Sequence, residues 1–220
     1  MCGRYFVEID HSYALKDCLT QAQKRLDALV SGSRIACGEI TPGMTVLALA
    51  RGKSGATGAF PMRWGYAVSG GKLIINARVE SAAARPMFAD SWKTRRCIVP
   101  ANCYFEWERV QTQTSFLEAQ DAFPAHGAEK IKRAIAPANA KFFWLAALYR
   151  YEPGQTLPAL VILTREADAS VARIHDRMPV MLDDAVAAQW LAPDSAPDPA
   201  VLRVLTNMRI ENSPGSEFLK

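Results

Sequence analysis

The chain has 220 residues, half of them hydrophobic, and carries a formal net charge of +4 at pH 7. A chain of this length and composition can bury a sizeable core, so we expect a single globular domain. No apolar run approaches the roughly 20 residues that span a bilayer, and the N-terminus lacks a secretory pattern, which excludes membrane and secreted classes. We therefore expect a cytoplasmic, nucleoid-associated protein that makes no membrane contact.

The cysteine pattern indicates reduced thiols. The five cysteines are odd in number and scattered, and none of them shows the short paired spacing of a zinc site. We expect three or four of them to be structural, and we expect neither a metal nor any other cofactor. The five are Cys2, Cys18, Cys37, Cys97 and Cys103.

Hydrophobic periodicity and turn signals predict the secondary structure in chain order. Leucines at helical spacing predict a helix from residue 11 to residue 30, after a first short strand. A Thr-Pro-Gly turn at 41–43 precedes an apolar strand at 45–50, and a loop of small residues at 51–58 follows that strand. Other strands are predicted at 4–9, 60–66, 73–77, 96–99, 103–108, 142–149 and 159–164. Further helices are predicted at 81–88, 168–174, 183–190 and 199–206.

The order of these elements predicts an α+β fold with a β-rich core and flanking helices, because strands outnumber helices and rarely alternate with them. No composition break divides the chain, so we expect one domain over 2–214. The polar, alanine-rich stretch 111–140 contains two prolines and is interpreted as an inserted helical excursion between two strands. Residues 215–220 resemble a tail or a cloning scar and are left out of the functional argument.

Basic residues crowd one third of the chain and are interleaved with aromatic residues. This pattern suits a groove that follows a nucleic-acid strand, with the aromatic rings as stacking platforms. A solvated basic face around core tryptophans explains the pattern equally well, so both alternatives stay open. The basic residues are Arg63, Arg78, Arg85, Lys93, Arg95 and Arg96, and the aromatic ones are Trp64, Phe88 and Trp92.

Cys2 is the most informative single residue, because removal of Met1 would leave a free α-amine and a thiol on one residue. The amine is partly neutral near pH 7, and the thiol becomes a thiolate where a neighbouring base or cation favours it. Such an aminothiol condenses with an aldehyde to an imine and then closes to a thiazolidine ring. The alternative is a retained Met1 followed by a buried, unreactive cysteine.

Five further polar residues occur in contexts that suit catalysis or anion binding. The Asn76 amide, at a strand end, can hold a substrate oxygen by hydrogen bonds. Glu106 among aromatic residues can move a proton if it points inward, and His175 can act as an acid or base near neutral pH. Arg78 and Arg177 can hold phosphate oxygens in a bidentate grip. Each residue has a structural alternative: a turn, an outward-facing strand position or a surface ion pair.

Six short motifs occur in order along the chain: Met1-Cys2-Gly3-Arg4-Tyr5, Trp64-Gly65-Tyr66, Asn76-Ala77-Arg78-Val79-Glu80, Cys97-Ile98-Val99-Pro100, Tyr104-Phe105-Glu106-Trp107 and His175-Asp176-Arg177-Met178-Pro179. A chance match to all of them is implausible. With these motifs the chain resembles the SRAP family, the SOS-response-associated peptidase-like proteins that crosslink to abasic sites in DNA. The resemblance extends from residue 2 to about residue 190, which is nearly the whole chain.

The resemblance implies a compact single α+β domain with a basic channel for single-stranded or junction DNA that contains an abasic site. It implies that a mature N-terminal Cys2 links to the aldehyde of the abasic sugar, and that the thiazolidine shields the lesion from strand cleavage. Asn76 would position the reacting groups, and Glu106 and His175 would move protons. We expect a monomer. DNA contacts are implied for Arg4, Pro42, Trp64, Arg78, Trp107 and Arg177.

One position departs from the family pattern and leaves a question about the channel. The family usually has Asn-x-Ala-Pro before the turn, whereas this chain reads Glu39-Ile40-Thr41-Pro42. A glutamate that lines a DNA channel would repel phosphate. Two other functions also stay open from the sequence. One is an N-terminal-nucleophile cysteine peptidase, with Glu106 or His175 as its base. The other is a module that binds single-stranded DNA without a covalent bond.

Overall fold

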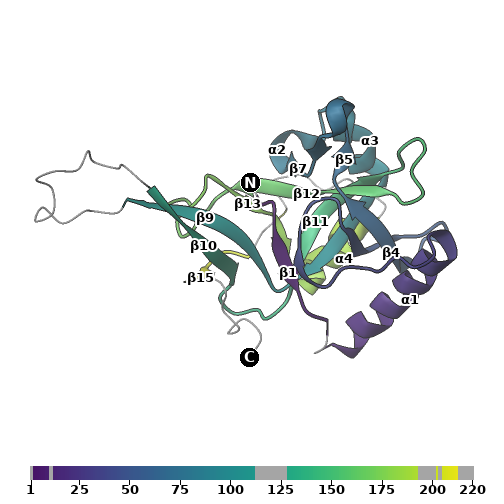
Figure 1. Cartoon of the computed structure of the whole chain (residues 1–220), viewed down its shortest axis with the longest axis horizontal. Coiled ribbons are helices and arrows are strands. Elements are labelled where there is room, and N and C mark those ends of the chain that lie inside the picture. The colour runs from purple at the N-terminus through teal and green to yellow at the C-terminus, as the bar shows by residue number, and fades with distance from the viewer. Residues whose placement is uncertain (1, 10–11, 112–127, 193–201, 203–204, 213–220) are drawn as a thin grey trace, which may run out of the picture.

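Two β-sheets form most of the computed structural model, in which residues 2–9, 12–111, 128–192, 202 and 205–212 are described (Figure 1). The expected α+β class is confirmed, since the described residues combine these sheets with four α-helices. Within the same ranges, no helix is long and apolar enough to cross a membrane.

The first sheet has five strands in the order β15-β10-β9-β1-β2, and its pairings are antiparallel. The β9 and β10 pair projects away from the body, at the left of Figure 1, while β1 lies against the body. This arrangement gives the N-terminal strand a central place between β9 and β2. The strands are β1 (Tyr5–Val7), β2 (Gly38–Ile40), β9 (Cys103–Gln111), β10 (Ala128–Pro137) and β15 (Met208–Asn212).

Five strands of the second sheet close into a barrel. The sheet order is β13-β12-β4-β3-β8-β11-β14, and a further pairing between β12 and β11 completes the ring. Strands in a closed ring are paired on both sides, and apolar runs that are buried throughout fill the interior. Most residues of β8, β11 and β12 are buried. The barrel strands are β3 (Thr45–Arg51), β4 (Thr57–Trp64), β8 (Arg96–Ala101), β11 (Phe143–Arg150) and β12 (Ala159–Glu166).

Short strands extend the barrel sheet. β7 pairs in parallel with β12, so that Asn76 lies opposite Ile162. β13 pairs with β12 and β14 pairs with β11, both antiparallel, while β5 and β6 form a separate two-stranded sheet. Their bounds are β5 (Tyr66–Ala67), β6 (Leu73–Ile74), β7 (Asn76–Arg78), β13 (Arg177–Pro179) and β14 (Met181–Leu182).

The helices cover the outside of the barrel, and α1 packs against β4. α1 begins after Ser12, whose hydroxyl accepts a hydrogen bond from the Leu15 amide at 3.3 Å, as an N-cap residue does. Its apolar face buries Leu15, Ala22 and Leu26. The helices are α1 (Tyr13–Leu29), α2 (Val79–Ala82), α3 (Pro86–Thr94) and α4 (Asp184–Leu191), with a 3-10 turn at Ser69–Gly71.

The corner between β8 and β9 holds the N-terminal strand in place. Asn102 at this corner donates its backbone amide to the Phe6 carbonyl at 2.8 Å, and its side-chain oxygen accepts from the Glu8 amide at 2.7 Å. The Asn102 side-chain amide also donates to the Lys141 carbonyl at 2.8 Å. One polar side chain therefore fixes β1, and with it the residues that precede β1, against the barrel.

Most of the predicted strands, and the helices at 11–30 and 183–190, are confirmed to within a few residues. The helix predicted at 168–174 is wrong, because the chain forms consecutive turns there. The Asp168 side chain accepts from the amides of Ser170 and Val171, and such local bonds compete with helix formation. The helix predicted at 81–88 is replaced by two helices, since Pro86 starts a new one.

The interpretation of 111–140 as a helical excursion is wrong in its described part. β9 continues to Gln111, and residues 128–137 form β10, which pairs with β9. The helix predicted at 199–206 lies mostly outside the described residues. Four short strands were not predicted: β2, β13, β14 and β15.

A buried arginine closes two helix ends against the barrel. Arg96 donates to the carbonyls of Trp190 at 2.7 Å, Trp92 at 3.2 Å and Ala192, and its guanidinium lies 5.5 Å from the centre of the Trp190 ring. The carbonyls at a helix C-terminus have no partner within the helix, so a side chain that satisfies them inside the protein stabilises the fold.

We expect Arg96→Met to lower the free energy of unfolding by about 2–4 kcal/mol, because two buried carbonyls and a partly buried one lose their donor. The matched control is Arg95→Met, which removes a half-buried arginine that pairs with the exposed Asp90 and should cost less than about 1 kcal/mol. Urea denaturation followed by tryptophan fluorescence measures both. Equal losses for the two variants would contradict the role of Arg96.

Candidate functional site

Cys2 lies fully buried just before β1. Its carbonyl oxygen accepts a hydrogen bond from the Asn76 side-chain amide at 2.9 Å, and its sulfur lies 3.8 Å from the Arg4 carbonyl oxygen. Burial raises the pKa of the Cys2 thiol to about 12, and the negative charge of Glu106 contributes to the rise. The thiol is therefore protonated at neutral pH, and it ionises only when a neighbouring group takes its proton.

Asn76 reaches Cys2 because β7 pairs with the barrel. The parallel pairing places Asn76 beside Ile162, and the Ile162 amide donates to the Ile75 carbonyl at 3.0 Å. The Asn76 side-chain oxygen is buried and has no hydrogen-bond partner among the described residues. A buried amide oxygen in this state can accept a proton donor from a substrate or from water.

Glu106 points inward, so of the two orientations that the sequence left open it adopts the buried one, at 6% exposure. It lies opposite Arg133 on β10 and shares a strand face with Tyr104, two residues earlier. Burial raises the pKa of Tyr104, and the charges of Cys2 and Glu106 raise it further. These three side chains therefore form one buried cluster. Sequence analysis missed Tyr104, although it stands in the same motif as Glu106.

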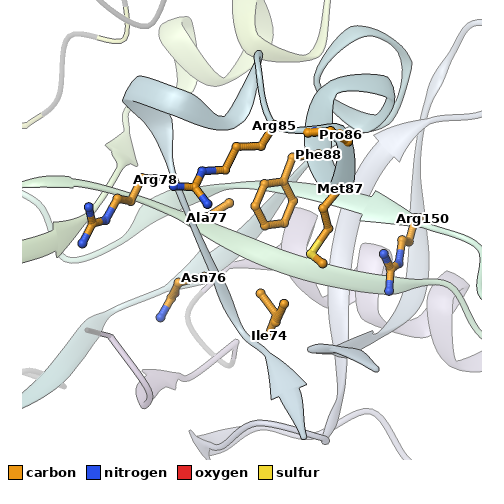
Figure 2. Close-up of a pocket in the computed structure, with 9 residues that line it drawn as sticks. All are labelled: Ile74, Asn76, Ala77, Arg78, Arg85, Pro86, Met87, Phe88 and Arg150. Atoms are coloured by element: carbon orange, nitrogen blue, oxygen red, sulfur yellow. The ribbon is translucent and has the colours of Figure 1, made fainter. Parts of the chain in front are cut away.

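A cavity of about 870 Å³ adjoins this cluster through Asn76 (Figure 2). Arg78 and Arg150 lie toward opposite ends, with Met87 and Phe88 between them. Arg150 is paired with the Glu152 carboxylate at 2.6 Å, whereas Arg78 has no carboxylate partner within the described part of the chain. The cavity thus offers an arginine to an anion. Its lining is Ile74, Asn76, Ala77, Arg78, Arg85, Pro86, Met87, Phe88 and Arg150.

His175 follows the turns at 168–174 and is partly exposed. Its Nδ1 accepts a hydrogen bond from the Arg177 amide at 2.9 Å, and the same atom lies 2.7 Å from a carboxylate oxygen of Asp176. His175 also lines a second cavity, of about 620 Å³, together with Trp107, which follows Glu106 on β9. The lining is Trp107, Arg109, Lys130, Arg173, Ile174, His175 and Asp176.

Arg177 is held by a carboxylate of the protein itself. Its guanidinium makes two bonds to Glu80, at 2.9 and 2.8 Å, and one to the Thr164 carbonyl at 2.6 Å. Partial burial raises the pKa of Glu80, but the hydrogen bonds from Arg177 outweigh it and lower that pKa below its usual value. The expected phosphate ligand therefore also joins β13 to α2.

The other expected DNA contacts lie on three separate elements. Arg4 lies with its guanidinium carbon 5.6 Å from the centre of the Trp107 ring, and Trp107 is 39% exposed. Pro42 is half-buried in the turn between β2 and β3. Gly43 has a φ of +89° there, which an L side chain rarely adopts, and its amide donates to the Trp64 carbonyl at 2.7 Å.

Trp64 offers no surface to DNA in this structure. Its side chain is fully buried, its ring nitrogen donates to the Ile75 carbonyl at 3.0 Å, and its ring packs 5.3 Å from that of Tyr5. Phe88 and Trp92 are buried as well. The three aromatic residues of this stretch therefore belong to the core and are not stacking platforms. Arg96, one of its basic residues, is buried as well and not part of a solvated face.

The cysteines are neither paired with one another nor part of a metal-binding cluster among the described residues. All five cysteines are free, and Cys37 is the exposed one among them. Within the described residues, no group of three or more histidine, cysteine, aspartate or glutamate side chains could hold a metal ion.

Solved structures share this fold. A protein from Bacteroides thetaiotaomicron aligns with a TM-score of 0.67 and 19% identity, over 96% of this chain and 91% of that chain. A phage-related protein from Bordetella bronchiseptica aligns with a TM-score of 0.65 and 23% identity, over 97% and 95% of the two chains. At these identities the likeness shows the fold alone.

Curated relatives match a shorter region. The abasic site processing protein YoqW of Bacillus subtilis is 32% identical over 61% of this chain and 54% of that protein. YedK of Escherichia coli, of the same description, is 31% identical over 60% and 54%. HMCES of Xenopus tropicalis, also so described, is 28% identical over 59% and 41%. The match therefore spans about half the length of these relatives, or less.

The family model described as "SOS response associated peptidase (SRAP)" matches residues 1–214, a range that contains every motif discussed above. This match covers all of the described residues. The chain belongs to the SRAP family.

Proposed function

We propose that this protein processes abasic sites in DNA by forming a covalent thiazolidine between Cys2 and the abasic sugar. The observation that carries the proposal is the hydrogen bond from Asn76 to the Cys2 carbonyl, with the charge of Glu106 beside the thiol. Similarity to proteins named abasic site processing proteins supports the substrate class.

The proposed substrate is single-stranded or junction DNA, because the sugar carbon C1′ must be reachable and its neighbouring bases unstacked. Arg78, at the cavity beside Asn76, is positioned to bind a backbone phosphate. In this proposal the protein acts as a monomer on DNA of the nucleoid.

The first covalent step uses the α-amine of Cys2, which becomes free once Met1 is removed. The amine nitrogen attacks C1′ of the open-chain aldehyde, the resulting carbinolamine loses water, and a protonated imine forms. Glu106 takes the proton that the attacking amine gives up and returns it to the carbinolamine oxygen, and a second proton from solvent lets that oxygen leave as water. Glu106 is then a carboxylate again before the second step. The hydrogen bond from Asn76 to the Cys2 carbonyl fixes this residue, so that its two nucleophiles approach the same carbon.

The second step protects the strand. A protonated imine acidifies the hydrogens on C2′, and β-elimination from this species would cut the DNA. When the Cys2 sulfur adds to C1′, the electron pair of the C=N bond moves to nitrogen, and the carbon becomes tetrahedral. The thiol proton must leave as the C–S bond forms. Because burial holds the pKa of this thiol near 12, a base at hand is required, and Glu106 is that base.

His175 is assigned to the opening of the sugar ring. An abasic sugar exists mainly as a closed hemiacetal, and opening requires a proton at the ring oxygen. His175 lines the cavity that Trp107 also lines, and its Nδ1 accepts a hydrogen bond from the Arg177 amide, so this assignment gives the proton transfer to Nε2.

We expect Cys2→Ala to abolish the denaturant-stable adduct with an oligonucleotide that contains an abasic site, with a loss in rate of at least about 100-fold. The variant keeps an α-amine after removal of Met1, so borohydride should still trap an imine. Intact mass spectrometry measures both products, and the adduct mass equals protein plus oligonucleotide minus water.

Cys37→Ser, which removes the exposed thiol, is the control for the Cys2 variant and should react like the parent protein. A stable adduct of Cys2→Ala at the parental yield would refute the covalent role of the sulfur. Cleavage of a peptide bond without formation of a DNA adduct would instead favour the alternative function as a cysteine peptidase.

We expect Glu106→Gln to slow adduct formation by about 100-fold at neutral pH, since proton transfer loses its base. Because the Glu106 charge raises the pKa of the Cys2 thiol, its removal lowers that pKa, and the deficit should shrink toward about pH 10. Quenched time courses on denaturing gels measure the rates. Glu129→Gln, an exposed position on β10, is the control; a rate for Glu106→Gln that matches it would remove Glu106 from the mechanism.

A further inference from the structure

A carboxylate of this chain lies between two cations on the outer face of the five-stranded sheet. Arg4 Nη1 lies 2.5 Å from Glu39 Oε1, and Lys132 Nζ lies 2.9 Å from Oε1 and 2.8 Å from Oε2 of the same side chain. We call these three residues the Glu39 bridge. They come from the residues before β1, from β2 and from β10, so the bridge spans the sheet.

Each cation of the Glu39 bridge also has an aromatic partner on β9. Arg4 lies over Trp107, and Lys132 Nζ lies 4.0 Å from the centre of the Phe105 ring. Phe105 and Trp107 are two residues apart on one strand, so both rings face the same side of the sheet. Because cation–π contacts hold the two cations in place, their positions do not depend on the carboxylate alone.

The Glu39 bridge is exposed to solvent, and its ion pairs are weak. The side chains of Arg4, Glu39 and Lys132 are 39%, 35% and 26% exposed. Ion pairs with this exposure contribute little net free energy, typically less than about 1 kcal/mol each, so another anion can replace the carboxylate. Partial burial raises the pKa of Glu39, but the hydrogen bonds from Lys132 and Arg4 outweigh it and lower that pKa. The carboxylate therefore remains charged at neutral pH.

The cavity beside His175 continues the same face of the sheet. The register places Lys132 opposite Trp107 and Lys130 opposite Arg109, so these four side chains share one face. Trp107, Arg109 and Lys130 line that cavity, where Arg173 joins them and Asp176 is the single carboxylate. A DNA strand with one phosphate at the Glu39 bridge would thus meet further cations along this face. One of its bases could stack on the half-exposed indole of Trp107.

We propose that Arg4 and Lys132 form a binding position for a DNA backbone phosphate and that the Glu39 carboxylate is its built-in competitor. Strand binding displaces Glu39 from the two cations, and the bridge re-forms when the strand leaves. Glu39 thereby limits the affinity for DNA, and the proposal rests on DNA being the ligand of the proposed function. An uncharged residue at position 39 would leave the phosphate position open.

The test is the affinity of Glu39→Gln for a fluorescent single-stranded oligonucleotide with a tetrahydrofuran residue in place of the abasic sugar. This probe has no aldehyde, so binding is measured without the covalent step. We expect binding to tighten roughly fivefold at low salt and its salt dependence to steepen by about one phosphate contact. Fluorescence anisotropy over a salt series gives both quantities.

Two further variants make the result specific. Asp17→Asn removes one negative charge at an exposed position of α1, which packs against β4 of the barrel, and should leave the affinity unchanged. Lys132→Met in the Glu39→Gln background should abolish the gain. Equal affinities for Glu39→Gln and Asp17→Asn, or a gain that survives Lys132→Met, would overturn the proposal. Crosslinking to a true abasic oligonucleotide, scored separately, tests the covalent function, so the two can fail independently.

Discussion

The hydrogen bond between the Asn76 side chain and the Cys2 carbonyl is the constraint on which the site depends. Asn76 belongs to a strand paired with the barrel, and Cys2 precedes a strand of the other sheet. A chain terminus normally frays unless it is tied down. Here the pairing of β1 on both sides and the Asn102 contacts hold the strand, and the amide of Asn76 fixes the residue before it. The two sheets together therefore define where Cys2 lies.

A second theme is that the cations of the site are already partnered by carboxylates of the chain. Glu80 holds Arg177, Glu39 holds Arg4, and Glu152 holds Arg150. A phosphate must compete with these internal anions, so the modest net charge says little about affinity for DNA. Arg78 differs, since no described carboxylate pairs with it. This difference orders the proposed contacts: Arg78 is open to phosphate at once, whereas Arg4 becomes open only when Glu39 moves.

The sequence predicted the barrel strands well because they are apolar runs bounded by turns, such as Ala-Leu-Val-Ile-Leu in β12. It failed for β10, whose alanines, lysines and glutamate favour a helix, and where pairing with β9 overrides propensity. Motifs singled out Cys2, Asn76, Glu106 and His175 as candidates, but they could not show that Trp64 is buried or that Glu106 points inward. Both depend on packing between distant strands. The contacts of Glu39 with Lys132 join residues 93 apart and have no local signal.

The elevated pKa of Cys2 is unfavourable for a nucleophile, yet it fits the proposed function, in which this residue reacts once and only with an abasic sugar. Burial and the Glu106 charge keep the sulfur protonated, which also protects it from oxidation and from other electrophiles. In the proposed mechanism Glu106, whose charge adds to the effect of burial on this pKa, also removes the thiol proton when the imine forms. A positively charged imine carbon beside the sulfur reverses the local electrostatics, because it favours the thiolate that Glu106 otherwise disfavours. In the proposed mechanism the sulfur is therefore activated by the first covalent step and not before it, so amine attack precedes thiol addition.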